Sequence, residues 1–271
     1  MFEGKTVLIT GAATIIGAEV ARVFAEYSAN VVLGDIDTDG GEEAAAAIGD
    51  RAVFVPLDLR SDPSVRSFVA AAIDRHGRID TLVNIACVYG DDGPGTDARA
   101  EWLEVLNTNV AGTAMLCAEA RSALRDTSGS IVTFTSPSGR VAQAGRIRYP
   151  VSKAALLQLT RSLALEYAAD GIRVNSVSPG WTWSRVMNEI TEGDRARTDA
   201  VASRFHMLGR AGDAREIGEV AAFLASPKAS FVTGAEWTVD GGYSALGPEQ
   251  TTSAIELLLR ERPPSHVPSL A

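Results

Sequence analysis

The chain has 271 residues, of which 46% are hydrophobic and 22% are charged, a composition that suits one α/β domain and excludes a disordered chain. Its net charge of −9 argues against sequence-independent binding to nucleic acid and against docking on an anionic membrane. Two cysteines, Cys87 and Cys117, are too few for a disulfide framework. With no signal-peptide pattern and no apolar run of about 18 residues, we expect a cytoplasmic protein without membrane or nucleic-acid partners.

Short apolar runs alternate with segments of helical periodicity along most of the chain. The predicted strands are Lys5–Thr10, Asn30–Asp35, Ala52–Pro56, Asp80–Asn84, Ser130–Ser136, Ile172–Val177 and Glu236–Asp240. Helices are predicted up to Tyr27 after the first strand, then over Pro63–His76 and Ala98–Arg125, from Pro150 onward, and over Ala214–Leu224. Repeated strand–helix units predict an α/β fold: a Rossmann-type doubly wound parallel sheet in one three-layer α/β/α domain, residues 1–246.

A glycine-containing turn, Gly11-Ala-Ala-Thr-Ile-Ile-Gly17, joins the first predicted strand to its helix. Such a turn brings backbone N–H groups and the positive helix end up to a phosphate. Asp35 follows 18 residues after Gly17, where an acid binds the ribose hydroxyls of a dinucleotide. No arginine adjoins Asp35 to receive a 2′-phosphate, so the sequence favours NAD over NADP as cofactor.

Polar or turn-forming residues stand where six of the predicted strands end. Ligands of parallel sheets bind beyond the carboxyl ends of the strands. We therefore expect one shared site at this edge of the sheet, built from Gly11, Asp35, Asp58, Asn84, Ser136 and Pro179.

The stretch Tyr149-Pro-Val-Ser-Lys153 opens the predicted helix that follows Ser136. Residues four apart share a helix face, so the phenol of Tyr149 and the ammonium of Lys153 can face one volume. A nearby cation favours the phenolate, and we expect Lys153 to lower the pKa of Tyr149 into a range useful for acid–base catalysis. The alternative is a chance pair on a solvated face. With only three lysines against 22 arginines in the chain, a lysine at this position favours the catalytic interpretation.

Two further segments stand out by composition. Residues 181–209 are polar in the middle and carry large apolar residues at both ends, which is typical either of a lid over a substrate or of an exposed loop pinned at its ends. Residues 247–271 form a tail with a possible short helix over Thr252–Arg262, whose apolar positions are Ile255, Leu258 and Leu259. This tail packs across a subunit boundary or frays.

Taken together, these motifs resemble those of the short-chain dehydrogenase/reductase family over roughly Gly4 to Gly242. The resemblance rests on the order and spacing of many pieces rather than on one motif. They are Thr10–Gly17, Asp35, Asp58-Leu59, Asn84-Ile-Ala86, Asn107-Thr-Asn-Val110, Ser136, Tyr149–Lys153, Pro179-Gly180 and the terminal FVTGAEWTVDGG.

The resemblance implies a catalytic role for four residues. Tyr149 exchanges a proton with the substrate oxygen, Lys153 lowers the pKa of Tyr149 and holds the nicotinamide ribose, Ser136 binds the substrate oxygen, and Asn109 anchors a proton-relaying water. Implied cofactor contacts are Gly11, Thr14, Ile15, Ile16, Gly17, Asp35, Ile36, Asp58, Leu59, Asn84, Ala86, Tyr149, Lys153, Pro179, Gly180 and Thr182. Implied substrate contacts are Ser136, Ser138, Gln143, Tyr149, Trp181, Met187 and Phe205, with Tyr89, Ile147 and Trp183 as further lining residues.

Three positions depart from the family pattern. Ile15 and Cys87 stand where glycine is usual, and Ile85 stands where a second asparagine is usual. Because a β-branched residue avoids positive φ, the turn at Ile15 must be right-handed or locally altered. Cys87 is either a reactive thiol or, as we expect, a small buried hydrophobe. His206 has no ligand pattern around it, and we expect no metal site.

We therefore expect an NAD-dependent enzyme that transfers a hydride between NAD and a secondary alcohol, cyclic or aromatic-bearing, and its ketone. One alternative is a 3-oxoacyl-thioester reductase, in which Arg146 and Arg148 dock an anionic carrier rather than being solvated surface residues. Another is a nicotinamide-binding regulatory protein without turnover, suggested by Ile15, Ile85 and Cys87. Family resemblance also implies a homotetramer.

Overall fold

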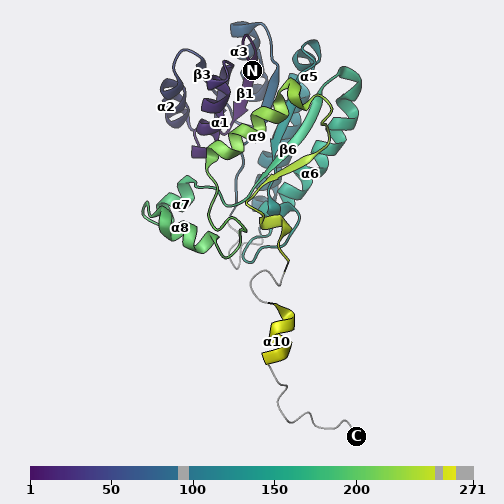
Figure 1. The fold of residues 1–271 in the computed structure, drawn as a ribbon. Coiled ribbons are helices and arrows are strands. Elements are labelled where there is room, and N and C mark those ends of the chain that lie inside the picture. Colours follow the sequence, from purple (N-terminus) through teal and green to yellow (C-terminus); the bar gives the residue numbers. More distant parts are fainter. Residues whose placement is uncertain (91–97, 248–252, 261–271) are drawn as a thin grey trace.

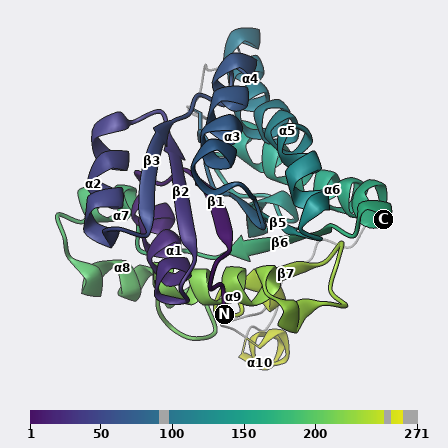
Figure 2. The same cartoon turned by 90° about the horizontal axis from the view of Figure 1, so that it is seen from above.

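The computed structural model describes residues 1–90, 98–247 and 253–260. Within them a single parallel sheet has the strand order β3-β2-β1-β4-β5-β6-β7, with helices on both faces (Figures 1 and 2). The strands are β1 (Thr6–Thr10), β2 (Asn30–Asp35), β3 (Ala52–Pro56), β4 (Thr81–Asn84), β5 (Ser130–Phe134), β6 (Arg173–Pro179) and β7 (Glu236–Val239). The predicted strands and the predicted Rossmann-type fold are thus confirmed. The strand order reverses between β1 and β4, which is where doubly wound sheets bind ligands.

The helices are α1 (Ile15–Glu26), α2 (Thr38–Ile48), α3 (Asp62–His76), α4 (Arg99–Leu106), α5 (Thr113–Asp126), α6 (Arg148–Tyr167), α7 (Arg185–Ile190), α8 (Arg195–Ala202), α9 (Ala214–Ala225) and α10 (Ala254–Arg260). Helix α2 was not predicted. Asp37 caps this helix by accepting a hydrogen bond from the Gly40 backbone N–H at 3.1 Å. Two glycines in its first turns hide the helix from sequence prediction, since glycine has low helix propensity. Gly41 is required there, because a Cβ at this position would lie 2.1 Å from the ring of Phe54.

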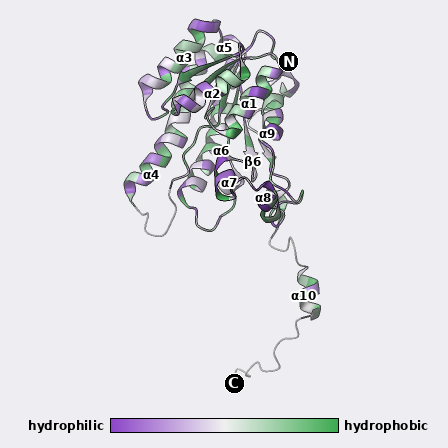
Figure 3. Cartoon of the chain, turned by 90° about the vertical axis from the view of Figure 1, so that its left-hand side faces the viewer, coloured by the Kyte–Doolittle hydropathy of each residue, from purple (hydrophilic) through white to green (hydrophobic). Residues whose placement is uncertain are grey.

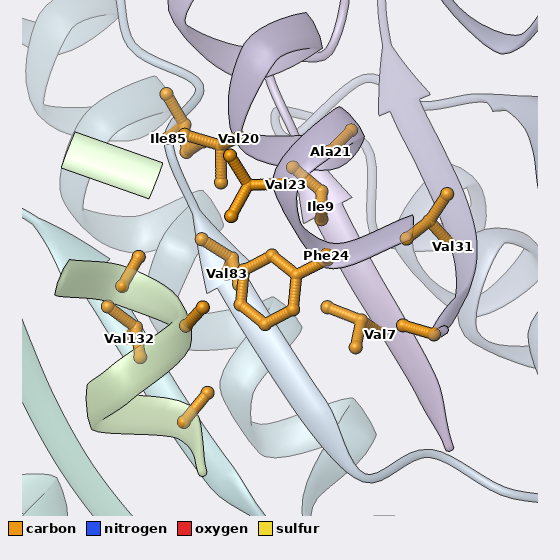
Figure 4. Close-up of a cluster of buried hydrophobic side chains, with 14 of the residues drawn as sticks. Val7, Ile9, Val20, Ala21, Val23, Phe24, Val31, Val83, Ile85 and Val132 are labelled. Carbon is orange, nitrogen blue, oxygen red and sulfur yellow. The ribbon is translucent and has the colours of Figure 1, made fainter. Parts of the chain in front are cut away.

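The alternation of side chains along β1 divides its residues between two hydrophobic cores. Val7 and Ile9 face α1 and α9, where they join Phe24 in the first core (Figure 4). Leu8 faces the other way and joins Phe68 of α3 in the second core. Because β1 is buried on both faces, its sequence is continuously apolar between the threonines at its two ends. This central strand fixes the start of the glycine turn at Thr10.

The predicted long helix over Ala98–Arg125 is present, but it is interrupted. A π-helical segment, Asn107–Gly112, lies between α4 and α5. It brings Gly112 so close to the loop after β3 that a Cβ there would lie 2.4 Å from the carbonyl oxygen of Leu59. Such π-bulges occur often at functional sites, and this one contains Asn109.

The segment 181–209 contains α7 and α8, which lie beyond the end of the sheet opposite the N-terminus (Figure 1). In the tail, α10 stands away from the rest of the described chain (Figures 1 and 3), and Ile255 and Leu259 are 70% and 80% exposed. Thr252, the side chain of Leu258 and residues 261–271 lie outside the described residues. In the described part of the chain, every helix is too short or too polar to cross a bilayer.

Candidate active site

Two glycines and a threonine make the turn between β1 and α1 compact. Gly11 has φ +74°, and a Cβ on it would lie 2.8 Å from the Ala86 backbone nitrogen. Gly17 is tighter, because its Cβ would lie 2.1 Å from the Gly11 carbonyl oxygen. Thr14 caps α1: its hydroxyl accepts from the Gly17 N–H at 3.0 Å and donates to the Gly11 carbonyl at 2.8 Å. The free N–H groups at the start of α1 thus face the carboxyl edge of the sheet, as a phosphate cradle requires.

Ile15 does not distort this turn. It is the first residue of α1 and does not have positive φ. A β-branched side chain is therefore accommodated without backbone strain, and the prediction of a right-handed turn is confirmed. The Ile15 side chain is 39% exposed at the mouth of the cradle, whereas Ile16 packs on the first core.

Asp35 lies at the end of β2, as predicted. Its carboxylate accepts hydrogen bonds from the backbone N–H of Ala13 and of Asp37, each at 3.0 Å. Among the described residues, no arginine or lysine forms an ion pair with it, and the next residue, Ile36, is 63% exposed. Asp35 therefore keeps an anionic, unneutralised oxygen at the edge of the cradle, which suits ribose hydroxyls and repels a 2′-phosphate.

The adjoining strand ends add further polar groups. Asn84 is buried and donates weakly to the Cys117 sulfur at 3.4 Å, while its Oδ1 has no hydrogen-bond partner. Thr10, which sequence reasoning missed, holds Ile85 and Ala86 in place by accepting from both backbone N–H groups, at 3.0 and 3.1 Å. An unpartnered buried carbonyl oxygen is costly unless a ligand or water meets it.

Asp58 and Leu59 differ in what they offer to a cofactor. The carboxylate of Asp58 pairs with Arg60 at 2.9 Å, and this hydrogen bond lowers the pKa of Asp58. Leu59 has a buried side chain in the second core, so only its backbone is available.

The far side of the site is formed by the end of β6. Pro179 closes this strand, and Gly180 passes so near Asp240 that a Cβ would lie 2.7 Å from its Cα. The hydroxyl of Thr182 is buried and donates to the Gly180 carbonyl at 3.2 Å. All three predicted contacts thus lie on one rigid backbone corner at the carboxyl edge.

Asn109 links the π-helical segment to both neighbouring elements. It is fully buried, and its side chain accepts from the Val88 N–H and donates to the Val88 carbonyl, both at 2.8 Å. It also donates to the Ser152 hydroxyl at 3.0 Å, and Ser152 in turn donates to the Tyr149 carbonyl at 2.7 Å. Asn109 therefore holds the β4 loop against the start of α6, and its role as a water anchor stays a prediction.

Tyr149, Ser136 and Lys153 meet beside the end of β5. Tyr149 is 8% exposed and lies close enough to Ser136 for the serine side chain to lower the pKa of the phenol, while Ser136 itself accepts from the Ser138 hydroxyl at 3.0 Å. The Lys153 ammonium lies 5.4 Å from the centre of the Tyr149 ring and donates to the Phe134 carbonyl at 2.7 Å. The predicted placement of the two side chains in one volume is confirmed, and the solvated alternative is wrong.

The expected lowering of the Tyr149 pKa by Lys153 is wrong for this structure. Burial dominates and raises the pKa of Tyr149, while the hydrogen bond from Ser136 and the cation of Arg146 act in the opposite direction. The Lys153 ammonium is bound to a backbone carbonyl instead. The phenol is therefore neutral at physiological pH, because removing it from water disfavours the phenolate more than nearby charges favour it.

A buried carboxylate beneath the Ser136 turn was missed by sequence reasoning. The Glu236 side chain, on β7, is 2% exposed; it pairs with Arg140 and accepts from the Thr135 hydroxyl at 3.0 Å. Its two partners flank the Ser136–Gly139 turn on either side. No local pattern in the sequence reveals this contact, because β7 lies 100 residues further along the chain.

Glu236→Ala is expected to lower kcat by about 10- to 100-fold, since a loosened Ser136 turn misplaces the reacting groups. Glu236→Gln keeps an acceptor for the Thr135 hydroxyl and should retain most of that rate. Steady-state kinetics at a temperature well below both melting transitions separate positioning from stability. Equal kcat for Glu236→Ala and the wild type, with only a lower Tm, would show that the contact is merely structural.

Two arginines before Tyr149 differ sharply. Arg148 is buried and pairs with Glu101. Both sequence interpretations of this residue, as a docking site for an anionic carrier and as a solvated surface arginine, are therefore wrong. Arg146 is exposed and lies over the rings of Tyr89 and Tyr149, with its guanidinium carbon 5.6 and 5.9 Å from their centres.

Cys87 is half-buried rather than buried, which corrects the expectation that it is a small buried hydrophobe.

Three of the predicted substrate contacts, Gln143, Trp181 and Phe205, belong to a chain of aromatic and polar side chains that also includes Tyr243 and His206. Gln143 donates to the Tyr243 hydroxyl at 3.2 Å, the Tyr243 ring lies 5.3 Å from His206, and Trp181 lies 5.5 Å from Phe205. His206 accepts from the Trp181 N–H through Nε2 at 3.1 Å, and its Nδ1 lies 2.9 Å from the Ala202 carbonyl. These two contacts make His206 an anchor of the segment 181–209.

Met187 lies on α7 and is half-buried, with no described contact to the other predicted substrate residues. Ser138 is buried under Ser136. A surface hollow of about 590 Å³ is lined by residues of α2, β3 and the end of α3, and it contains none of the predicted site residues.

The fold and this edge of the sheet define a dinucleotide-binding protein of the Rossmann type. The cradle at Gly11–Gly17, the anionic Asp35 and the orphaned Asn84 oxygen fit a nicotinamide dinucleotide. A family model described as enoyl-(acyl carrier protein) reductase matches residues 11–244. The chain belongs to the short-chain dehydrogenase/reductase family, whose members are oxidoreductases.

Three similar proteins illustrate the range of this family. A cis-4-hydroxycyclohexanecarboxylate dehydrogenase of Sinomonas cyclohexanicum is 38% identical over 253 residues, covering 90% of this chain and 98% of that protein. An L-fucose dehydrogenase of Oryctolagus cuniculus is 36% identical, covering 92% and 88%. The crystal structure of a 3-ketoacyl-(acyl-carrier-protein) reductase from Brucella melitensis complexed with NADH has a TM-score of 0.81 at 29% identity, covering 90% and 100%.

Proposed function

We propose that this chain transfers a hydride between NAD and a secondary alcohol carried on a ring, with Tyr149 exchanging the hydroxyl proton. The observation that carries the proposal is the buried Tyr149 beside Ser136, with the Lys153 ammonium 5.4 Å from its ring centre, at the sheet edge where the glycine turn opens. When bound, the nicotinamide accepts or supplies the hydride. The protein's own groups then hold the substrate oxygen and move a single proton at the Tyr149 oxygen.

Each neighbour of Tyr149 supports this proton transfer differently. Ser136 is tied to Ser138 and presents its hydroxyl to the phenol, so it can share the substrate oxygen. Lys153 is rigid, because its ammonium is bound to Phe134 and is 2% exposed. We propose that Asn109 fixes the relative position of α6 and the β4 loop, and that residues 181–209 cover the substrate.

Asp35 supports NAD rather than NADP. Its carboxylate is fixed by two backbone N–H groups and faces no cation among the described residues. A fixed anion pairs well with the two ribose hydroxyls of NAD and repels the additional phosphate of NADP. The NADH complex of the Brucella melitensis structure favours the same cofactor.

Similar proteins support a ring-borne alcohol. The names of the Sinomonas cyclohexanicum and Oryctolagus cuniculus enzymes describe alcohols of a cyclohexane and of a sugar. The aromatic chain from Tyr243 to Phe205 offers flat apolar surfaces that suit such a ring.

A panel of cyclic and linear secondary alcohols with NAD or NADP, followed by NADH or NADPH absorbance, tests the proposal. We expect turnover of cyclic alcohols with NAD and a lower kcat/KM with NADP. No reduction of either cofactor with any alcohol would instead favour the regulatory, non-catalytic alternative.

The pH dependence of the reaction follows from the raised pKa of Tyr149. The phenol is protonated at neutral pH, so the form that accepts a proton during alcohol oxidation grows as pH rises, up to about tenfold per pH unit. Carbonyl reduction needs the protonated phenol and should be flat over the same range. Profiles of kcat/KM in both directions measure this; an oxidation rate that falls between about pH 7 and 9 would contradict it.

A 3-oxoacyl-thioester reductase is the second candidate, favoured by the family model and by the Brucella melitensis structure. Arg148 cannot dock a carrier, since it is buried, and only Arg146 is available. Consumption of NADH with a 3-oxoacyl thioester, faster than with any cyclic ketone, would establish this activity instead.

A further inference from the structure

The cation nearest the phenol on the open side of the site is Arg146. It forms a short antiparallel bridge with Gln143, in which the Arg146 backbone N–H donates to the Gln143 carbonyl at 3.3 Å. Its guanidinium carbon lies 5.6 Å from the centre of the Tyr89 ring and 5.9 Å from that of Tyr149, and the two rings are 4.8 Å apart. The guanidinium group therefore lies over the pair of rings that includes the proposed proton-exchanging phenol.

No carboxylate of the described residues neutralises Arg146. Most arginines of the described chain pair with an acid, and Arg140 in the same loop binds the Glu236 carboxylate. A cation over an aromatic ring is held only weakly when the ring is exposed, so this contact alone leaves most of the hydrogen-bonding capacity of Arg146 unused. A guanidinium group presents a planar fork of donors that matches a carboxylate in two parallel hydrogen bonds.

The surrounding side chains are either uncharged or already hydrogen-bonded to another group of the protein. Ser136, Gln143 and Trp181 carry no charge, and the Lys153 ammonium is bound to the Phe134 carbonyl. The chain as a whole has a net charge of −9. An arginine that no carboxylate in the described part of the chain neutralises makes the site mouth locally attractive to anions within this acidic protein.

We propose that Arg146 binds a carboxylate carried by the substrate, so that the preferred substrates are cyclic hydroxy acids whose hydroxyl group meets Tyr149 while their anionic group meets Arg146. This rests on the proposed function and adds the class of substrate to it. Arg146 thereby sets both the specificity and the orientation of the ring, since two anchored ends leave one face toward the cofactor.

The test compares a cyclic hydroxy acid, 4-hydroxycyclohexanecarboxylate, with its uncharged carboxamide. In Arg146→Gln we expect kcat/KM for the acid to fall about 10- to 100-fold, mainly through KM, with little loss for the amide. The ratio of the two values is the readout, because any change in the protonation of Tyr149 affects both substrates alike. Arg161→Gln, at an exposed arginine roughly 18 Å along α6 from Tyr149, carries the same change of charge and should leave the ratio unchanged.

Calorimetric binding of cyclohexanecarboxylate to the full chain separates this inference from the proposed function. Binding that is lost in Arg146→Gln supports the inference even if no alcohol is oxidised. An unchanged ratio in Arg146→Gln, or equal binding of cyclohexanecarboxylate by the variant and the wild type, overturns it.

Discussion

Tyr149→Phe is expected to lower kcat for alcohol oxidation by about 100- to 10,000-fold, the usual contribution of a positioned acid or base. The substitution removes one oxygen from a ring that is 8% exposed and leaves its stacking on Tyr89 intact. The folded structure and the dinucleotide cradle should therefore persist. Stopped-flow and steady-state rates give the loss, and fluorescence titration with NADH should show binding within a factor of a few of the wild type.

Tyr89→Phe is the matched control for this experiment. Its ring lies 4.8 Å from that of Tyr149, and the residue is 47% exposed, so the loss of its hydroxyl leaves the packing around Tyr149 unchanged. If proton exchange belongs to Tyr149 alone, losing the second phenol has a small effect on kcat. A Tyr149→Phe enzyme that turns over at the wild-type rate would falsify the proposed mechanism.

Gly17→Ala is expected to abolish tight dinucleotide binding and to destabilise the fold. Its Cβ would lie 2.1 Å from the Gly11 carbonyl oxygen, a backbone atom that cannot move without opening the turn. Such overpacking typically costs about 1–3 kcal/mol, which corresponds to a drop in Tm of several degrees for a domain of this size. Differential scanning calorimetry and NADH titration measure the two effects, and we expect NADH affinity to fall at least about tenfold.

Gly247→Ala provides the comparison, because a Cβ at that position meets nothing within 4 Å and its φ is not positive. It should bind NADH and melt like the wild type. If Gly17→Ala binds NADH normally, the cradle is not where the phosphates lie, and the assignment of this turn is wrong.

Much of the fold was predictable, because the spacing of apolar residues along the sequence indicates which faces of each strand and helix are buried. The strands are apolar runs since the sheet is covered on both faces, and each was located to within a few residues. Helix α2 was not predicted because its two glycines have low helix propensity. The close approach of the Phe54 ring of β3, which favours glycine at position 41, is visible only in the structure. The π-helical turn around Asn109 was likewise invisible, since its reason is the approach of Gly112 to Leu59.

The candidate site likewise has features that the sequence predicted and features that it did not. The spacing of Tyr149 and Lys153 placed both side chains in one volume, because helix geometry is local. Their electrostatics were predicted wrongly, since burial and the Phe134 carbonyl outweigh the attraction between the two groups. The partners of Glu236 and the contrast between buried Arg148 and exposed Arg146 also depend on distant segments.

By itself the sequence determined the order of strands and helices, the glycine turn, the acid that follows it and the residues gathered at one edge of the sheet. These properties follow from side-chain period and from the backbone freedom of single residues. Only the tertiary structure decided the direction of the Tyr149 pKa shift, the partners of Arg140 and Arg148, and the position of Arg146 with no carboxylate of the described residues beside it. Desolvation and long-range pairing depend on which surfaces meet, and no stretch of sequence contains that information.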